Sequence, residues 1–470
     1  MPARHARLTD ASDELAAALA AIRDELGLTA EFPPAAQAEA EAYAASPRLP
    51  DADRTDIDFV TIDPDGSTDL DQALHLERGG DGFVVRYAIA DVPAFVEPGG
   101  AIDAEARRRG QTMYAPDGRV PLHPPIVNEG AASLLEGQER GAYVWTMHLD
   151  ASGDVTETTL ERARVRSRAQ LTYVEAQRRV DAGDAMLGLL REIGELRISL
   201  EEAREGASLD MPEEQVVRDG DDFAIERREL LPVERWNAQL SLMTGMEAAN
   251  LQLRAKRGIL RTMPVPPPGD VERFRTEVRA IGEEWVEGEH YGAFLRRLDR
   301  SKPTTLAILQ AARRLFRGAS YTVLDDDSVA SELEQAAIGA PYAHTTAPLR
   351  RLVDRYVLAH CEATANGREI PAWAAEGLEG LPEIMQASSQ LASRLERESI
   401  DAVEIAVLRH RIGEEFDAVV VEARKEGATI QLLDPPTEAA CDTAAEPGTR
   451  IRVRLTEADL AARRLRFAEA

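Results

Sequence analysis

The sequence predicts an α+β fold in which a strand-rich part, a helix-rich part and a small β-barrel follow one another. Short runs rich in β-branched and aromatic residues are separated by Gly, Pro and Asp turns from Ile57 to about Thr158. From about Ala169 to Arg411, apolar residues recur at helical spacing instead. Residues 412–470 return to strand-like runs with turns at KEG and EPG, which is the size and pattern of an OB-fold barrel.

These changes divide the chain into three regions, residues 1–48, 49–411 and 412–470. The first region predicts one or two helices, because apolar residues keep helical spacing in DELAAALAAIRDELGL and in AEAEAYAAS, on either side of EFPPAAQ. The linker SPRLPDADR leads into the second region, where mixed β-sheets pack against helices and PVPPPGD forms a loop. Helices of this region are expected at 180–205, 234–257, 301–317 and 348–364.

The composition limits the classes of protein to which the chain can belong. Aspartate and glutamate total 83 against 55 lysine and arginine, so the net charge is −28. This balance excludes a uniformly basic nucleic-acid-binding surface, but it does not exclude a local basic channel. There is no apolar run long enough to cross a membrane and no uninterrupted apolar stretch typical of a secretory signal. Cys361 and Cys441 lie far apart and support neither a disulfide framework nor a thiolate zinc site, which fits a cytoplasmic protein.

An acidic cluster lies in TIDPDGSTDLDQALHLE, in a turn between two strand-like runs. A solvated turn is one interpretation, because Asp is common in loops. An EF-hand calcium loop is disfavoured, because counting from the first aspartate places Gly66 at the fourth position and Leu74 at the twelfth, where that loop requires Gly at the sixth position and Glu at the twelfth. The aspartates of the cluster are Asp63, Asp65, Asp69 and Asp71.

The third interpretation of the cluster is a catalytic magnesium site. Mg²⁺ prefers oxygen ligands and uses a few carboxylates together with water and substrate phosphate. Asp63 ends one strand, and Asp69 and Asp71 are two residues apart, so they point to one face if the backbone is extended. Asp91, at the end of the next long strand, either approaches the same place or caps a turn. On this interpretation, the spacing can place the carboxylates of Asp63, Asp69 and Asp71 round one or two ions, Mg²⁺ or alternatively Mn²⁺.

A second motif, YAHTTAPLRRLVDRYVLAH, places two arginines at a predicted helix start. Pro348 and the apolar run after it mark the start, so Arg350 and Arg351 fall in the first turn, where the helix dipole disfavours cations. Binding of a phosphate would resolve that conflict, and Asp354 has the spacing to hold Arg350. The alternative is an ordinary surface helix with ion pairs. With the aspartates, the motif indicates phosphoryl chemistry, in which Mg²⁺ binds the phosphate and Arg neutralises the developing charge.

These motifs, with YAIADVPAFV and RRGQTMYAPDGRVPLHPPIVNEGAASLLEGQERGAYVW between them, resemble the catalytic domain of the ribonuclease II / ribonuclease R family from roughly Asp56 to Arg411. The resemblance implies an RNB-type catalytic domain that degrades single-stranded RNA processively from its 3′ end in RNA decay and processing. It also implies Mg²⁺ dependence, release of nucleoside 5′-monophosphates and a monomer. Residues 412–470 weakly resemble the OB-fold RNA-binding domain of the family.

The resemblance also assigns roles to individual residues. Asp71 matches the aspartate most closely tied to catalysis, and Asp63 and Asp69 match metal-site aspartates. Arg350 matches the arginine that touches the scissile phosphate. The remaining RNA-binding candidates are the base-stacking Tyr114, the nucleotide-contacting Glu396, the channel-mouth Tyr173 and the second arginine of the motif, Arg351.

Some positions depart from the family pattern. Gln72 stands where the family usually has a fourth aspartate, so it offers a carbonyl but no charge. Leu209 or Met211 occupies the region of a second base-clamping aromatic, and Asn237 stands near a common glutamate. Residues 1–48 are helical where relatives carry two cold-shock barrels. They are interpreted either as a helix-turn-helix-like RNA guide or as a brace on the catalytic domain.

Three hypotheses remain at this point. The first is an exoribonuclease whose acidic exterior hides an Arg-lined channel. The second is an RNA-binding protein with an inactive nuclease fold, which Gln72 motivates. The third is an acidic protein whose metal-binding aspartates are structural. It does not explain why Arg350, Tyr114 and Glu396 stand at positions that match the family pattern. We therefore expect the first.

Overall fold

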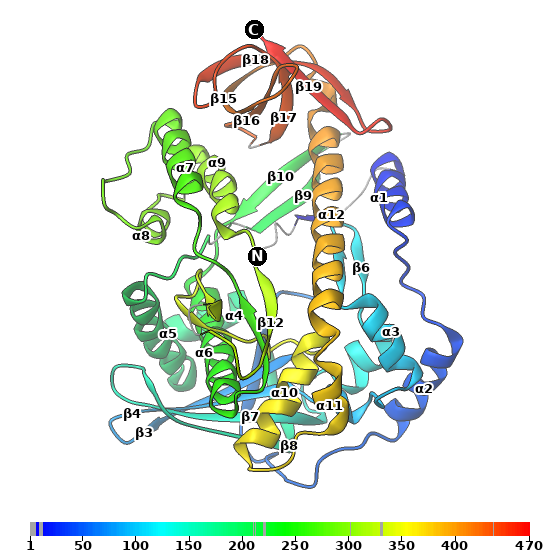
Figure 1. The fold of residues 1–470 in the computed structure, drawn as a ribbon. Coiled ribbons are helices and arrows are strands. Elements are labelled where there is room, and N and C mark those ends of the chain that lie inside the picture. Colours follow the sequence, from blue (N-terminus) through cyan, green and yellow to red (C-terminus); the bar gives the residue numbers. More distant parts are fainter. Residues whose placement is uncertain are drawn as a thin grey trace.

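The computed structural model describes residues 6–8, 13–209, 211, 213–219, 222–300, 302–329, 332–435 and 437–470 (Figure 1). The strands are β1 (Ala6–Leu8), β2 (Phe59–Asp63), β3 (Gln72–Gly79), β4 (Gly82–Ala90), β5 (Met113–Ala115), β6 (Gly118–Val120), β7 (Glu139–Leu149), β8 (Val155–Thr172), β9 (Glu213–Asp219), β10 (Asp222–Arg228), β11 (Gly258–Thr262), β12 (Ser320–Leu324), β13 (Glu334–Gln335), β14 (Ala340–Pro341), β15 (Glu415–Ala423), β16 (Ala428–Leu432), β17 (Glu438–Asp442), β18 (Arg450–Asp459) and β19 (Arg464–Glu469).

The helices confirm the α+β class that the sequence predicts. The α-helices are α1 (Asp13–Glu25), α2 (Pro34–Ala45), α3 (Ala101–Arg109), α4 (Tyr173–Asp181), α5 (Ala185–Ala203), α6 (Pro232–Ala255), α7 (Pro268–Ile281), α8 (Tyr291–Arg296), α9 (Pro303–Ala312), α10 (Leu352–Ala365), α11 (Ala372–Gly377) and α12 (Leu381–Leu408). Shorter turns are the 3-10 helices η1 (Val92–Ala94), η3 (Arg313–Phe316) and η5 (Arg409–Arg411) and the π-helix η2 (Ile126–Ala131).

The strand-rich half closes into a barrel of β2, β3, β4, β7 and β8. Neighbouring strands are antiparallel except β2 and β8, which run parallel with Asp63 opposite Thr172. Almost every residue of β4 is buried, because its inner face fills the barrel and its outer face is covered. Trp145 and Tyr87 are among the largest fully buried side chains of this core. The barrel therefore gives the aspartate turn, which joins β2 to β3, a rigid base.

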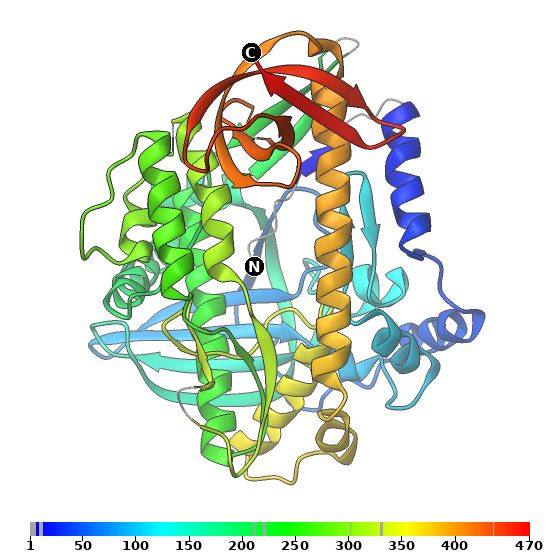
Figure 2. The same ribbon diagram turned by 45° about the horizontal axis from the view of Figure 1, so that its top comes forward.

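The long helix α12 runs from this body toward the C-terminal barrel, as Figures 1 and 2 show. One face of α12 packs on α1, where Leu15, Leu19 and Ile22 are buried against Leu395 and Val403. The other N-terminal helix, α2, packs on α3 and η2 instead. The two N-terminal helices thus lie against different parts of the catalytic body.

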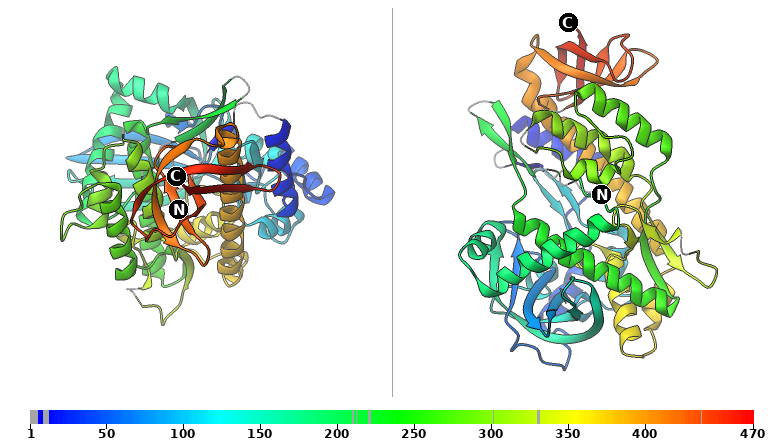
Figure 3. Two further views of the ribbon diagram at one scale, coloured as in Figure 1. Left: turned by 90° about the horizontal axis from the view of Figure 1, so that it is seen from above. Right: turned by 90° about the vertical axis from the view of Figure 1, so that its left-hand side faces the viewer.

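The predicted C-terminal barrel is confirmed. Five strands close in the order β15-β16-β17-β19-β18, and Figure 3 shows this barrel and the first one at opposite ends of the molecule. Val419 and Leu433 of the C-terminal barrel share a core cluster with Phe274 and Val278 of α7. Apolar packing therefore attaches the C-terminal barrel to the helix-rich half of the main domain.

The structure corrects several predicted boundaries. The helix expected at 180–205 is two helices, because Gly183 takes a left-handed conformation (φ +85°) between α4 and α5. The strands of the first barrel continue to Thr172, and a hairpin of β9 and β10 lies within the helix-rich half. The helix expected from residue 348 begins only at Leu352. Within the described residues, no helix is long and apolar enough to cross a membrane.

Two glycines of α5 provide a matched test of packing. A Cβ at Gly194 would lie 2.4 Å from Trp236 Cβ, whereas a Cβ at Gly188 would meet nothing within 4 Å. Gly194→Ala is therefore expected to lower the free energy of unfolding by about 1–3 kcal/mol. Gly188→Ala is expected to raise it by about 0.5–1 kcal/mol, since Ala favours helix over Gly. Urea unfolding of both variants measures the difference, and equal shifts would contradict this packing.

Candidate active site

The aspartate turn faces the arginine motif across the interior of the main domain. Asp71, directly before β3, is 3% exposed. Its Oδ1 accepts from the Leu349 N–H at 2.8 Å, and its Oδ2 accepts from Arg350 Nε at 3.2 Å. The 46% exposed Arg350 side chain leaves the guanidinium accessible from outside. The structure therefore brings the two predicted catalytic residues into direct contact.

Burial makes two aspartates of the turn, Asp63 and Asp71, unusually reluctant to ionise. Loss of solvent raises the pKa of Asp63 and of Asp71 to about 7, although the charge of Arg350 opposes the rise and that of Asp69 adds to it. Asp63 Oδ2 is buried and has no hydrogen-bond partner within the described part of the chain. A carboxylate oxygen in this state is suited to a cation, which would replace the lost solvation.

Asp69 has a partner that the sequence analysis did not identify. Arg119 Nη1 lies 2.6 Å from Asp69 Oδ1, and Arg119 Nη2 lies 2.9 Å from both Thr68 Oγ1 and Glu129 Oε1. Arg119 belongs to the hairpin of β5 and β6, where it is paired with Tyr114. The turn APDG indicates that hairpin, so the sequence could have predicted that Arg119 and Tyr114 lie on the same face of it. The salt bridge to Asp69 was not, because it joins distant segments.

The predicted placement of the arginines on a helix is wrong. Arg350 lies in a turn before α10, and Arg351 is the N-cap residue of α10 with extended backbone (φ −133°, ψ 124°). Asp354 does not hold Arg350. Its carboxylate accepts from Arg351 Nε (3.0 Å) and Nη2 (2.8 Å) and from the Ala347 N–H (2.7 Å). The turn forms because Asp71 and Asp354 satisfy its backbone N–H groups, and it directs the two arginines to different partners.

Tyr114 and Tyr173, two predicted RNA contacts, belong to different elements, β5 and α4. Tyr114 is 37% exposed and is close enough to Asp69, Asp71 and Arg350 to be affected by their charges. Tyr173 begins α4 and packs partly against the main core. An accessible aromatic ring beside the charged cluster can stack on a base.

The departures from the family pattern also have defined surroundings. The Tyr87 hydroxyl donates to Gln72 Oε1, so the carbonyl that replaces a carboxylate is already hydrogen-bonded. Asn237 Nδ2 donates to the Ile62 carbonyl (3.4 Å), beside Asp63. Asp91 is fully buried, and its Oδ2 pairs with Arg162 Nη2 (2.6 Å). Leu209 is buried in the core cluster of α7 to α9, and Met211 packs against the same cluster.

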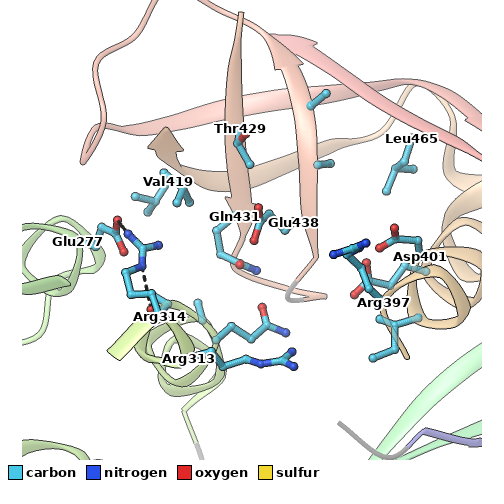
Figure 4. Close-up of a pocket in the computed structure, with 18 of the residues that line it drawn as sticks. Glu277, Arg313, Arg314, Arg397, Asp401, Val419, Thr429, Gln431, Glu438 and Leu465 are labelled. Carbon is cyan, nitrogen blue, oxygen red and sulfur yellow. Dashed lines mark hydrogen bonds and ion pairs between the residues drawn. The ribbon is translucent and has the colours of Figure 1, made fainter. Parts of the chain in front are cut away.

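Glu396 lies in a cavity beneath the C-terminal barrel. The cavity has a volume of about 630 Å³ and is bounded by α7, α9, α12 and the barrel. Figure 4 shows Arg313 and Arg397 reaching into it from opposite sides. Glu396 Oε1 lies 3.4 Å from Arg313 Nη2, and Glu277 Oε1 lies 2.5 Å from Arg314 Nη1. The arginines that line the cavity are Arg313, Arg314, Arg317, Arg397, Arg424 and Arg463.

A second recess, of about 400 Å³, adjoins this cavity and shares Arg317, Ser393 and Arg397 with it. It lies between β12 and α12, and no carboxylate of the described residues lines it. Its lining includes Tyr321, whose hydroxyl bonds to His344 Nδ1 at 2.7 Å in the segment that leads to Arg350. A chain of arginine-lined hollows therefore extends along α12 in a protein of net charge −28.

The aspartates have the donor atoms that a divalent metal needs, but their side chains are not assembled into a complete coordination site. Among the described residues, no group of three Asp, Glu, His or Cys side chains stands close enough to hold an ion. The donors are nevertheless hard carboxylate oxygens, and one buried oxygen of Asp63 lacks a partner in that part of the chain. Asp63, Asp69 and Asp71 are the residues that would hold the ion, completed by water and a substrate phosphate.

Comparison with known families agrees with this geometry. The RNB domain matches residues 52–365, and the RNase II-type exonuclease C-terminal S1 domain matches residues 414–470. The chain therefore belongs to the RNB domain family, as its motifs predict. Within that family it has the domain pair of ribonuclease II-type exonucleases.

Individual relatives show how far the likeness extends. Over 313 residues the chain is 28% identical to human exosome complex exonuclease RRP44. The aligned region covers 63% of this chain and 32% of that relative. The chain thus spans about a third of the length of that relative. Mycoplasma genitalium RNase R, solved with ribose-methylated single-stranded RNA, superposes with a TM-score of 0.83 at 18% identity, over 97% of this chain and 78% of that one. Yeast Ssd1, a pseudonuclease, superposes with a TM-score of 0.66 at 16% identity, over 93% of this chain and 55% of that one.

Proposed function

We propose that this protein is a metal-dependent 3′→5′ exoribonuclease that degrades single-stranded RNA processively to nucleoside 5′-monophosphates. The contact between Asp71 and Arg350 is the observation that carries the proposal. It pairs an acidic group with a cationic group that reaches the accessible side of the site. This is the arrangement that hydrolysis of a phosphodiester needs.

Each residue of the site has a proposed task. Arg350 binds the scissile phosphate and neutralises the charge that develops on it. Tyr114 stacks on the terminal base and so places the last phosphodiester against Arg350. Asp63, Asp69 and Asp71 hold Mg²⁺, with Mn²⁺ as the alternative. When bound, that ion supplies Lewis acidity and lowers the pKa of an attacking water.

The hollows along α12 support a polyanionic substrate. They bring arginines from α12, η3 and the C-terminal barrel around one cavity and continue to Tyr321, whose hydroxyl bonds to His344. Arginine forks suit phosphates. The surrounding carboxylates, such as Glu396 and Glu277, keep part of that charge paired until RNA enters. We infer that single-stranded RNA follows this path from the C-terminal barrel.

A gel assay tests the proposed activity. Purified protein is incubated with a 5′-labelled single-stranded RNA, with and without Mg²⁺, and the products are resolved under denaturing conditions. A Mg²⁺-dependent short labelled end product with few intermediates is expected. The same RNA blocked at its 3′ end is the control, because an enzyme acting from that end leaves it intact. Internal fragments, or equal decay with and without Mg²⁺, would contradict the proposal.

Metal binding is expected to depend on pH. The raised pKa of about 7 for Asp63 and Asp71 means that protons compete with Mg²⁺ below pH 7. For each carboxyl that must lose a proton, the apparent affinity should fall by about tenfold per pH unit below 7. Mg²⁺ should therefore raise Tm more at pH 8 than at pH 6, and Asp63→Asn should abolish the rise.

The metal-free protein should show the opposite trend with pH. Because the folded pKa values of Asp63 and Asp71 lie above the ordinary pKa of an aspartate, the folded state binds protons more tightly than the unfolded state. The contribution of these groups to stability therefore falls as pH rises from about 4 through 7.

Asp65→Asn is the control, because Asp65 is exposed in the same turn. An equal effect of Mg²⁺ at both pH values would argue against these aspartates as the metal site.

Base stacking gives a separate prediction for Tyr114. Tyr114→Ala is expected to weaken RNA binding by about 1–3 kcal/mol, whereas Tyr114→Phe, which keeps the ring, should bind almost normally. Fluorescence anisotropy with a short labelled RNA in the presence of Ca²⁺ in place of Mg²⁺ measures the affinity. Equal losses in the two variants would assign the effect to the hydroxyl instead of the ring.

An RNA-binding protein with an inactive nuclease fold is the alternative. The observation that favours it is the hydrogen bond from Tyr87 to Gln72, which places a neutral, already bonded amide among the aspartates. The pseudonuclease Ssd1 has the same overall fold. Intact RNA under every divalent ion tried, together with a clear gel shift, would select this alternative.

A further inference from the structure

Leu349 joins the catalytic pair to a buried histidine. Its N–H donates to Asp71 Oδ1 (2.8 Å), and its carbonyl oxygen lies 3.2 Å from His123 Nδ1. A carbonyl oxygen can only accept, so Nδ1 carries the proton and His123 is the donor. Because Arg350 is the next residue, the two peptide groups of Leu349 lie between the histidine and both charged groups of the site.

The backbone around this contact is fixed on both sides. The Thr112 N–H donates to the Arg350 carbonyl (2.9 Å), and the Leu352 N–H donates to the Gly110 carbonyl (3.0 Å). Thr112 Oγ1 in turn accepts from the Leu122 N–H (3.0 Å), directly before His123. The segment that carries Arg350 is therefore held by 110–112 through backbone bonds and by His123 through its side chain.

Besides the Leu349 carbonyl, the imidazole interacts with the side chain of Asn128. His123 is 1% exposed, and its Nε2 makes no hydrogen bond of standard geometry within the described residues. Burial, and after it the charge of Arg355, lowers the pKa of His123 to about 4, so the ring is neutral at pH 7. Burying a polar ring with one unsatisfied nitrogen is unfavourable. An apolar side chain would avoid that cost but would lose the bond to Leu349.

We propose that His123 is a positioning residue. It holds the Leu349 peptide and thereby keeps the side chains of Asp71 and Arg350 in their positions relative to each other. This inference rests on the proposed function, because it assigns His123 to the reaction of the same site. His123 is buried behind the segment and does not line either hollow along α12. Its loss should therefore lower turnover without weakening RNA binding.

Three substitutions separate positioning from packing. In His123→Asn the amide nitrogen takes the place of Nδ1, in His123→Gln it takes the place of Nε2, and His123→Leu offers no donor. We expect the Gln and Leu variants to lower kcat by about tenfold, the effect of one lost hydrogen bond, with KM for RNA within about twofold. The Asn variant should keep most of the wild-type kcat. His148→Leu, on the exposed part of β7, is the control.

Hydrogen exchange gives a readout that does not need catalysis. The Leu349 amide is protected through Asp71, so His123→Leu should speed exchange in the 347–352 peptide by about tenfold, and His123→Asn should not. If the wild-type protein never cleaves RNA, the proposed function fails while this result still tests the role of His123. Unchanged exchange in the Leu variant, or equal losses of kcat in the Asn and Leu variants, would overturn the inference.

Discussion

Asp71→Asn is expected to lower kcat by about 100- to 1,000-fold while RNA binding is kept. Asp71 is 3% exposed, its carboxylate contacts Arg350, and the charges of both Arg350 and Asp69 act on it. Asn is nearly isosteric and can still accept from the Leu349 N–H. It removes the negative charge, however, and with it one proposed ligand of the metal.

Single-turnover decay of a labelled RNA in Mg²⁺ measures the change, and anisotropy measures affinity. Binding should be unchanged or tighter, because one negative charge near the phosphate is lost. Asp65→Asn should behave as wild type, since Asp65 is exposed in the same turn. Thermal unfolding should confirm that Asp71→Asn is folded, because burial already disfavours the charged carboxylate. Turnover within threefold of wild type would remove Asp71 from the mechanism.

Arg350→Ala is expected to lower kcat by about 1,000-fold, the scale found when an arginine that neutralises a transferring phosphoryl group is removed. Arg350→Lys should lose less, about 10- to 100-fold, because it keeps the charge but not the planar fork. The variant also leaves Asp71 without the guanidinium that lies 3.2 Å from it. Asp71 is then expected to take up a proton at higher pH.

The comparison of kcat with KM decides what Arg350 does. A fall in kcat with little change in KM would mean that Arg350 acts in the transition state, whereas a rise in KM alone would mean uniform binding of RNA. Arg78→Lys on β3 is the control, because Arg78 pairs with Glu192 on the surface. Wild-type kinetics for Arg350→Ala would support the inactive-fold alternative if RNA still binds.

Arg351 illustrates why neighbouring residues need separate tests. The sequence places it beside Arg350 as a second RNA contact. In the structure its guanidinium is bonded twice to the fully buried Asp354. Removal of one partner of a buried ion pair leaves an uncompensated charge. We therefore interpret Arg351 chiefly as a support for the turn that carries Arg350.

Much of the fold was predictable because it depends on local periodicity. Strand-like and helical patterns located the strand-rich region, the C-terminal barrel and most helices, whereas the closure of the first strands into a barrel was not predicted. Boundaries were less predictable where backbone contacts compete with propensity. Pro348 is a good helix start by sequence, yet α10 begins at Leu352, because Arg351 takes an extended backbone and the Arg350 carbonyl accepts from the Thr112 N–H instead of from a helical N–H.

The candidate site was predicted in its composition but not in its pairing. The spacing of Asp63, Asp69 and Asp71 indicates carboxylates that share a turn, and the arginine motif indicates a phosphate contact. The partner of Asp69, Arg119, could not be identified, because the pair is separated by 50 residues. The role of His123 was equally inaccessible, since it depends on a hydrogen bond to a backbone carbonyl 226 residues away.

The sequence by itself determined the order of the domains, the acidic turn and the residues able to do phosphoryl chemistry, because residue type and short spacing set strand faces, turns and donor atoms. The tertiary structure alone decided that Arg350 meets Asp71 across 279 residues, that Arg351 does not, and that Asp63 and Asp71 are buried enough to hold protons near pH 7. The physical reason is that desolvation and ion pairing depend on which distant segments pack together. Spacing along the chain does not contain that information.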